Sequence, residues 1–413
     1  MKTKCFICFL IFWAGVTAPA AFGQMTLGQY EDEAPAGSWN ATGYNGADAL
    51  SLGGLSFAFA RDVTGITANP ALINRLPGFT LAVNGFFTNA SMQKFAVVNT
   101  GVLATQESPG VSVYGLDFGG VTYQVNQWGF ALAAGILEIY DRPAVTSEYE
   151  SGGEVLRRVS FKQNGFLRSF SLSVCRWLGN RITAGIGINL VSGSLERESL
   201  DYYSFYDDLT ISDNRSQSFS GFFLNGGITA ELHPGVILAA VFRSPYRKNA
   251  EGESLSRYHI PAHGTDIQIS GNQDSRYHQP FMAGAGLSFQ VTREFRGTAD
   301  LAFFNWRRYK VNYFGVDLPR DFRNTLPFGL GAEYLGALNI LGVELKIPVW
   351  AGFHYDPQPM TDPASFYSSF SFGIGIRSRH IFLHVGSKFS TEQGSGDDLA
   401  VRAAALTIGY KSE

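Results

Sequence analysis

Residues 370–376 read Phe-Ser-Phe-Gly-Ile-Gly-Ile, with a large apolar side chain at every second position and Ser or Gly between them. Period-two alternation is the pattern of a β-strand whose two faces meet different surroundings. Three further segments show the same pattern: 182–190, 222–232 and 281–290. In each of them an apolar face lies opposite a face of small or polar residues. The sequence therefore predicts a protein built largely from amphipathic strands.

The non-apolar face of these strands decides between two classes of β protein. A soluble β-sandwich also alternates, but its polar face meets water and usually carries charged residues rather than Gly and Ser. The chain has 413 residues, of which only 16% are charged, 14% are aromatic and 47 are glycines. After residue 24 no stretch reaches the roughly 18 uninterrupted apolar residues that a transmembrane helix needs. This composition favours a transmembrane β-barrel, whose apolar face meets lipid and whose small and polar face lines the lumen.

Strand and gap lengths give the predicted topology. Thirteen clear strands lie at 110–125, 128–140, 165–177, 181–195, 219–232, 236–243, 280–291, 295–304, 326–334, 340–353, 366–377, 380–389 and 401–410. The gaps alternate between very short and long, as the periplasmic turns and extracellular loops of bacterial barrels do. The long gaps are 141–164, 196–218, 244–279, 305–325, 354–365 and 390–400. A closed antiparallel barrel of this type needs an even number, so one more strand is expected within 79–98. We predict an all-β, 14-stranded antiparallel transmembrane β-barrel.

The residues ahead of the barrel divide into two parts. Residues 1–23 have the form of a cleaved signal peptide, with Lys2 and Lys4 before an apolar run and small residues before Gln24. Cys5 and Cys8 fall inside that segment, which leaves Cys175 without an internal disulfide partner. Residues 24–78 are rich in Gly and Ala, and we predict that they form a hatch that plugs the lumen of the barrel, 79–413. The alternative is a disordered periplasmic tail, although five Leu and Phe side chains between residues 50 and 59 are more apolar than a tail requires.

Charge and motif content argue against other function classes. The 32 basic residues are outnumbered by 35 acidic ones, which gives little support to nucleic-acid binding. Glycines at 185, 187, 284, 286, 373 and 375 alternate within strands and never complete a GxGxxG turn, so they are interpreted as small lumen-facing positions. The seven histidines show no metal-ligand spacing, and no nucleophile is singled out beside His384. We therefore predict a protein that is not an enzyme and has no cofactor, metal or catalytic residue.

Several short motifs, in order, resemble one known family. Residues 47–54 and the following Asn69-Pro70-Ala71 are similar to the N-terminal hatch of FadL-type long-chain fatty acid transporters. Phe242-Arg243-Ser244-Pro245 resembles that family's aromatic-Arg-Ser-Pro element at a strand end. Each motif is weak alone, but the resemblance runs almost end to end along the chain after residue 24. Further matching blocks lie at 305–309, 331–334 and 351–359.

The resemblance implies a monomeric outer-membrane barrel in contact with lipid and lipopolysaccharide, which takes up long-chain fatty acids or other hydrophobic compounds by passive diffusion. Ligands would be captured by an outer groove, passed to an internal pocket and released as the hatch shifts, through a lateral opening into the membrane. The alternative is a non-transporting FadL-like barrel that serves as an assembly or secretion docking partner. The hatch motif and an aromatic loop slightly favour transport.

Candidate site residues follow from strand parity and from the resemblance. Arg243 lies on the face opposite Val236, Leu238 and Ala240 and is expected to point into the lumen. There it either binds a ligand carboxylate or belongs to a charge lattice of the lumen. Asn69 and Pro70 are expected to set the backbone turn of the hatch. Four aromatic residues lie in the long gap at 196–218: Tyr202, Tyr203, Phe205 and Tyr206. They either form a groove that captures a ligand or pack the loop.

Overall fold

The computed structural model describes residues 46–412 apart from 77, 93, 94, 100, 273, 314, 319, 320, 341, 363 and 395–398. The predicted signal peptide and the first part of the predicted hatch, residues 24–45, lie outside the described residues. Short helices in the described chain are α1 (Ala47–Ser51) and the 3₁₀-helices η3 (Val63–Thr67), η4 (Pro70–Arg75), η5 (Ser204–Tyr206), η6 (Pro261–His263) and η7 (Trp306–Arg308). Among the described residues, no helix is long and apolar enough to cross a membrane.

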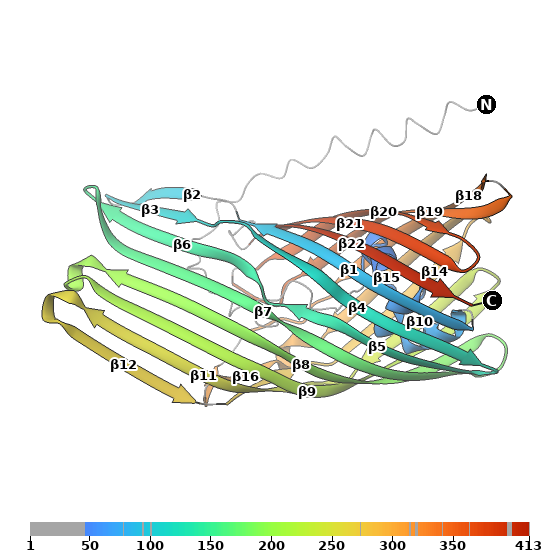
Figure 1. The fold of residues 1–413 in the computed structure, drawn as a ribbon, viewed down its shortest axis with the longest axis horizontal. Coiled ribbons are helices and arrows are strands. Elements are labelled where there is room, and N and C mark those ends of the chain that lie inside the picture. Colours follow the sequence, from blue (N-terminus) through green and yellow to red (C-terminus); the bar gives the residue numbers. More distant parts are fainter. Residues whose placement is uncertain are drawn as a thin grey trace, which may run out of the picture.

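Fourteen described strands close into one antiparallel barrel, as predicted (Figure 1). β1 closes the ring because it pairs with β4 on one side and with β22 on the other. Around the ring the strands are β1 (Phe79–Ser91), β4 (Val111–Val125), β5 (Trp128–Ile139), β7 (Glu154–Trp177), β8 (Ile182–Tyr203), β9 (Leu209–His233), β10 (Val236–Arg243), β14 (Met282–Gln290), β15 (Phe295–Phe304), β18 (Phe328–Ile340), β19 (Val343–Pro357), β20 (Phe366–Arg377), β21 (Ile381–Gln393) and β22 (Ala400–Lys411).

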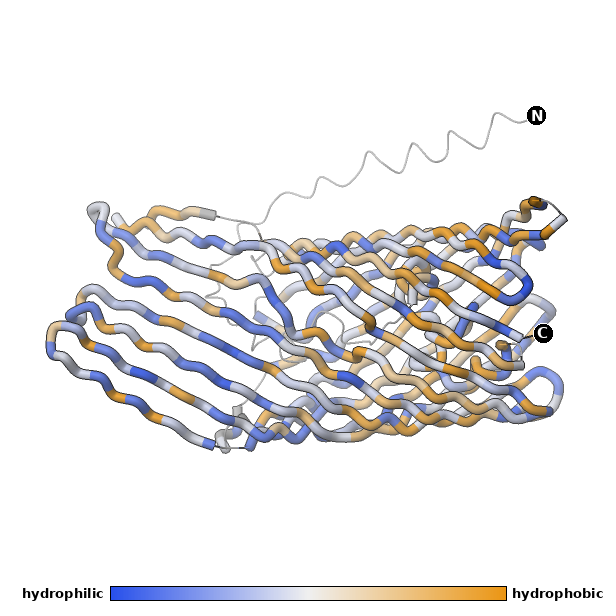
Figure 2. Tube along the Cα trace, in the orientation of Figure 1, coloured by the Kyte–Doolittle hydropathy of each residue, from blue (hydrophilic) through white to orange (hydrophobic). Residues whose placement is uncertain are grey.

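The outer face of the barrel is the apolar face. In β20, Phe370, Phe372 and Ile374 are each about half exposed, whereas Ser371 between them is buried. Figure 2 shows apolar residues spread through the half of the barrel that holds the short turns, and more polar strands toward the opposite end. An apolar outer face with a polar lumen is the surface of a barrel that spans a lipid bilayer.

Four of the six predicted long gaps, 141–164, 196–218, 244–279 and 305–325, contain strands. These strands extend the wall and project from one end of the barrel (Figure 1). The extension comprises the outer parts of β7, β8 and β9 together with β2 (Phe95–Asn99), β3 (Val102–Glu107), β6 (Arg142–Ser151), β11 (Tyr246–Ile260), β12 (Thr265–Asn272), β13 (Ser275–Gln279), β16 (Lys310–Tyr313) and β17 (Val316–Leu318). The hairpins pair with one another, and the edge strands β12 and β17 each pair with one neighbour among the described residues.

One short turn also differs from its predicted position. β18 continues to Ile340 instead of ending at residue 334, so the turn does not span 335–339. The Asn339 side chain accepts a hydrogen bond from the backbone N–H of Gly342, at 3.1 Å. Gly342 has φ +80°, a conformation that side chains other than glycine rarely adopt. The chemistry of this Asn-to-Gly turn therefore decides where β18 ends and β19 begins.

Candidate ligand pathway

The described part of the hatch, residues 46–76, is folded inside the lumen, and Asn69 organises its centre. The Asn69 side chain is fully buried and accepts a hydrogen bond from Ala71 N–H at 2.9 Å, which caps η4. Its Nδ2 donates to the Phe57 carbonyl at 2.7 Å. Pro70 occupies the first helical position, where its missing N–H costs nothing. The side chain of Asn69 thus holds two segments of the hatch together, in the turn that the sequence predicted.

Glycines of the wall let the hatch approach the barrel backbone closely. A Cβ built on Gly185 would lie 2.7 Å from the Ala71 nitrogen, and one on Gly227 would collide with the Asn69 carboxamide. Side chains essentially never tolerate such contacts, so a larger residue at either position would displace the hatch. The predicted lumen orientation of the alternating glycines is confirmed, and more of them face the hatch: Gly129, Gly286, Gly329, Gly331, Gly352, Gly373 and Gly386.

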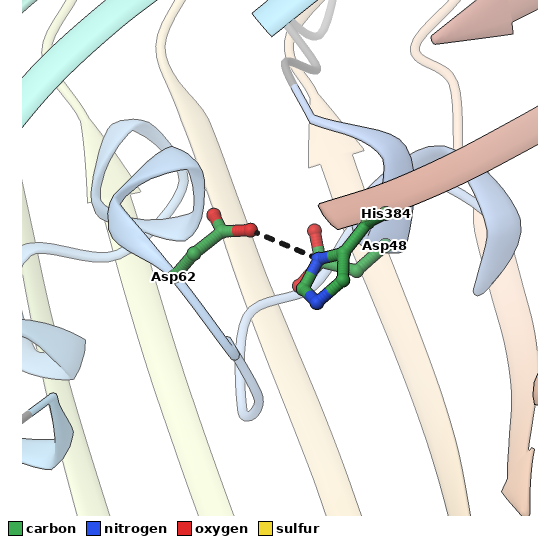
Figure 3. A group of neighbouring side chains, drawn as sticks. All are labelled: Asp48, Asp62 and His384. Atoms are coloured by element: carbon green, nitrogen blue, oxygen red, sulfur yellow. Dashed lines mark ion pairs between the residues drawn. The ribbon is translucent and has the colours of Figure 1, made fainter. Parts of the chain in front are cut away.

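A buried cluster joins the hatch to strand β21 (Figure 3). His384 Nδ1 lies 3.4 Å from Asp62 Oδ2, and both side chains are fully buried. Asp48 is the third member, and the ligand-type atoms of the three residues all lie within 4.8 Å of one another. Three protein ligands are one fewer than in a structural zinc site, but they are the number that a catalytic zinc site uses together with water. The contact between His384 and Asp62 ties the hatch to the wall.

A second hatch-to-wall anchor lies at Arg61. Its guanidinium makes a bidentate contact with the Glu333 carboxylate on β18, in which Nε donates to Oε2 at 3.0 Å. The indole N–H of Trp350 donates to the same carboxylate at 3.0 Å. Because the Glu333 side chain is almost completely buried, these donors compensate the cost of removing its charge from water.

A cavity between the hatch and the wall, the lumen cavity, contains Arg243. Its lining is mainly apolar and includes Leu55 and Phe57 of the hatch and Phe223 and Phe304 of the wall. Arg243 faces the lumen, as predicted, and its guanidinium lies 5.7 Å from the Phe223 ring centre and 5.6 Å from that of Phe304.

The charge of Arg243 is not balanced by a carboxylate among the described residues, where its Nε is buried without a hydrogen-bond partner. Three carboxylates of the lumen that could pair with Arg243 contact other groups instead. Glu333 binds Arg61, Glu231 lies 3.7 Å from Arg75, and Asp300 accepts a hydrogen bond from Phe57 N–H. This arrangement favours the ligand-binding alternative for Arg243 over a place in the charge lattice.

The end of β5 bends toward the lumen while it stays paired with β7 as far as Ile139↔Phe166. Residues 136–139 are all buried, which breaks the alternation that the rest of the strand keeps. The register with β7 shifts between Ile136 and Glu138, so Leu137 is the extra residue of a bulge. Glu138 pairs with the fully buried Lys248 of β11, Nζ to Oε2 2.7 Å, and Tyr140 donates to the same carboxylate at 2.5 Å.

This inward turn leaves a gap in the hydrogen-bonded wall. β4 and β5 pair from Phe118↔Gly135 to Val125↔Trp128 and no further among the described residues. Two hollows meet at the gap. The side cavity lies inside and is lined in part by Leu50 of the hatch, and the outer recess is lined in part by Leu116. Phe86 and Ile136 line both hollows, so the side cavity and the outer recess adjoin at these two residues.

The predicted aromatic set lies at the tip of the β8–β9 hairpin. Phe205 and Tyr206 are 58% and 59% exposed, with ring centres 4.5 Å apart. Tyr202 donates to Asp208 and Tyr203 to Asp201, so their hydroxyl groups are fixed within the tip. None of these side chains lines the lumen cavity, the side cavity or the outer recess. Capture of a ligand by this set stays a prediction.

Solved structures with the same architecture include a hydrocarbon channel, a toluene transporter and a FadL homologue. The monoaromatic hydrocarbon channel CymD matches with a TM-score of 0.64 and 16% identity, over 91% of this chain and 98% of that one. The chain has the FadL-type fold. The Ralstonia pickettii toluene transporter TbuX matches at 0.62 and 14%, over 91% and 99%, and a Pseudomonas aeruginosa FadL homologue at 0.63 and 12%, over 91% and 98%. No protein-family model and no curated protein matches the sequence.

Within this FadL-type fold, sequence reasoning missed two features of the pathway. His384 had the correct parity, but its partners Asp48 and Asp62 lie more than 300 positions earlier, and no spacing rule connects them. The Glu138–Lys248 pair and the gap beside it were also missed. The bulge at Leu137 was the available signal, because four consecutive residues at 136–139 are large or charged where alternation should continue.

Proposed function

We propose that the chain is an outer-membrane passive transporter for long-chain fatty acids or other hydrophobic compounds. The observation that carries the proposal is the gap between β4 and β5, where the side cavity inside and the outer recess outside share Phe86 and Ile136. A ligand could leave the lumen sideways at this gap without crossing the hatch. The similar solved structures include a monoaromatic hydrocarbon channel and a toluene transporter, and this likeness supports a hydrophobic ligand.

The lumen cavity supplies the chemistry for an amphiphilic ligand. Its apolar lining can take up a hydrocarbon tail, which gains about 0.8 kcal/mol per buried CH₂ group. Arg243 offers a guanidinium that no described carboxylate neutralises. A carboxylate can accept two parallel hydrogen bonds from such a group, so we infer that fatty acids bind here more tightly than uncharged hydrocarbons.

The remaining parts of the proposal concern location and gating. Residues 1–23 would direct export and be cleaved, and residues 24–78 would act as the hatch of a monomeric barrel. Asn69, Pro70 and Ala71 would set the gating geometry, because this turn contacts both the rest of the hatch and the wall at Gly185 and Gly227. The exposed Phe205 and Tyr206 would help to capture ligand at the cell surface.

Ligand titration of the purified full chain tests the transport proposal. Native mass spectrometry after lipid extraction, in a detergent that does not mimic a fatty acid, would follow binding of labelled C16 fatty acid and of toluene. We expect saturable binding of both ligands, with the fatty acid weakened by Arg243→Ala. Arg257→Ala, an exposed arginine on the outer extension, is the control. A lumen that binds neither ligand, with a protein partner retained through purification, would instead assign the chain as a docking barrel.

The exit route has its own test. Deletion of Leu137 removes the extra residue of the bulge and would let β5 continue its alternation beside β4. We expect this deletion to abolish uptake of labelled fatty acid into cells. Because Leu137 also lines the lumen cavity, binding to the purified protein is measured on the same variant. Unchanged uptake in a folded Leu137 deletion would show that ligand does not leave through the wall at this gap.

A further inference from the structure

Three basic side chains form a row on the outer face of the extension. β11, β13 and β16 pair side by side, with Arg247 opposite His278 and His278 opposite Lys310. Their neighbours along the strands, Lys248 and Tyr277, are buried, so the row points away from the lumen. Because paired strands lie about 4.8 Å apart, one anionic group can reach all three side chains.

This row lines an open groove, the basic groove, defined by Arg247, His278, Arg308, Lys310 and the aromatic Phe281. Arg276 flanks it, two residues from His278 on the same strand and face. Among the described residues none of these cations has an ion-pair partner. The one carboxylate in the lining, that of Asp317, accepts a hydrogen bond from Asn312 at 2.7 Å.

The pKa of His278 reflects the positive charges around it. Partial burial and then the charges of Arg247, Lys310 and Arg276 lower the pKa of His278, against a smaller effect of Asp317 in the other direction. The positive charge of the groove comes mainly from its arginines and lysine, and their charges oppose protonation of His278. An anion bound there would relieve the repulsion among them.

The basic groove lies directly beyond an aromatic belt of the barrel. The rings of Phe242 in β10, Phe281 just ahead of β14 and Phe303 in β15 follow one another, with ring centres 6.2 and 5.8 Å apart. Phe281 belongs both to this belt and to the groove, and Arg247 follows Phe242 by five residues. Aromatic girdles mark the level of lipid headgroups, so the cations stand where the phosphates of the outer leaflet are found.

We propose that the basic groove is a binding site for the phosphate groups of lipid A, the phosphorylated anchor of lipopolysaccharide, with acyl chains against the aromatic belt. The inference rests on the outer-membrane location given under the proposed function. The outward direction of the row favours a membrane lipid over a transported fatty acid, because the lumen and its cavity lie on the opposite face of these strands. The role of the site would be to hold the extension at the membrane surface.

Binding of bisphosphorylated lipid A to the full chain in nanodiscs of neutral phospholipid tests this proposal. The variants are Arg247→Ser, Lys310→Ser and the double variant, and the control is Arg257→Ser, which lies on the same strand and face ten residues farther out. A surface cation near a phosphate contributes a factor of about five to binding. We expect about a fivefold loss for each single variant, roughly 25-fold for the pair, and no loss for the control.

Three parallel measurements interpret the result. Monophosphorylated lipid A should bind more weakly than the bisphosphorylated form, and millimolar inorganic phosphate should not displace either form. Binding of C16 fatty acid should be unchanged in the double variant, so a failed lipid A site and a failed transport function are told apart. Equal lipid A binding by the double variant and the wild type would overturn the proposal. Loss of fatty acid binding alone would reassign the groove to ligand capture, and displacement by inorganic phosphate would reassign it to free phosphate.

Discussion

The Glu138–Lys248 ion pair is predicted to be a major contributor to the stability of the barrel, because it fixes the inward end of β5. The Lys248 and Glu138 side chains are 0% and 3% exposed, and their charged atoms are 2.7 Å apart. Lys248 Nζ also lies within 5.7 Å of the ring centres of Tyr140, Phe219 and Tyr277, and Tyr140 donates a hydrogen bond to Glu138. Removing one partner of such a pair leaves an uncompensated buried charge.

The change Lys248→Met keeps the length of the side chain and removes its charge. We expect it to lower the free energy of unfolding by about 3–5 kcal/mol, the usual cost of breaking a buried pair. Adding Glu138→Gln to Lys248→Met should restore much of that loss, because the stranded carboxylate is gone. Urea unfolding of the barrel in lipid vesicles, followed by tryptophan fluorescence, measures Lys248→Met, Glu138→Gln and the double variant in one double-mutant cycle.

A surface pair in the same extension provides the matched control. Lys162 lies 3.8 Å from Glu198 and both side chains are more than half exposed, so Lys162→Met should cost less than about 1 kcal/mol. If Lys248→Met loses no more stability than Lys162→Met, or if the double variant is less stable than both single variants, then the reasoning about the buried pair is wrong.

Three further predictions concern the hatch and the lumen cavity. Asn69→Ala removes the cap of η4 and the bond to Phe57, and should lower hatch stability by roughly 0.5–2 kcal/mol, seen as faster protease cleavage within residues 46–76. Gly227→Ala forces a methyl group against Asn69 and should cost about 1–3 kcal/mol in urea unfolding. Gly119→Ala, where the added carbon meets open space, should cost much less, and equal losses would contradict the close-contact argument. Arg243→Ala should weaken C16 fatty acid binding by about tenfold or more and leave toluene binding unchanged, because a charged hydrogen bond contributes about 1.5–3 kcal/mol. Equal weakening of both ligands would show that Arg243 only shapes the cavity.

The positions of the barrel strands were within reach of sequence reasoning because alternation is a local property. A strand between lipid and lumen must place apolar side chains at every second residue whatever its neighbours are, and β4, β10 and β20 lie within a residue or two of their predicted bounds. The number of strands followed from the alternation of gap lengths and from the need to close the ring. The side of Arg243 and of the wall glycines followed from the same parity.

The site depended on contacts that no local pattern encodes. Asp62 meets His384 across 322 positions, and Arg247, His278 and Lys310 form one row only because β11, β13 and β16 pair in a particular register. Register between strands depends on turn geometry and on packing across the whole ring, so a shift of one residue would send these side chains to the opposite face. The sequence by itself determined the strands and their two faces. Tertiary structure decided which charges meet, where the wall opens beside β5, and which cavity receives Arg243.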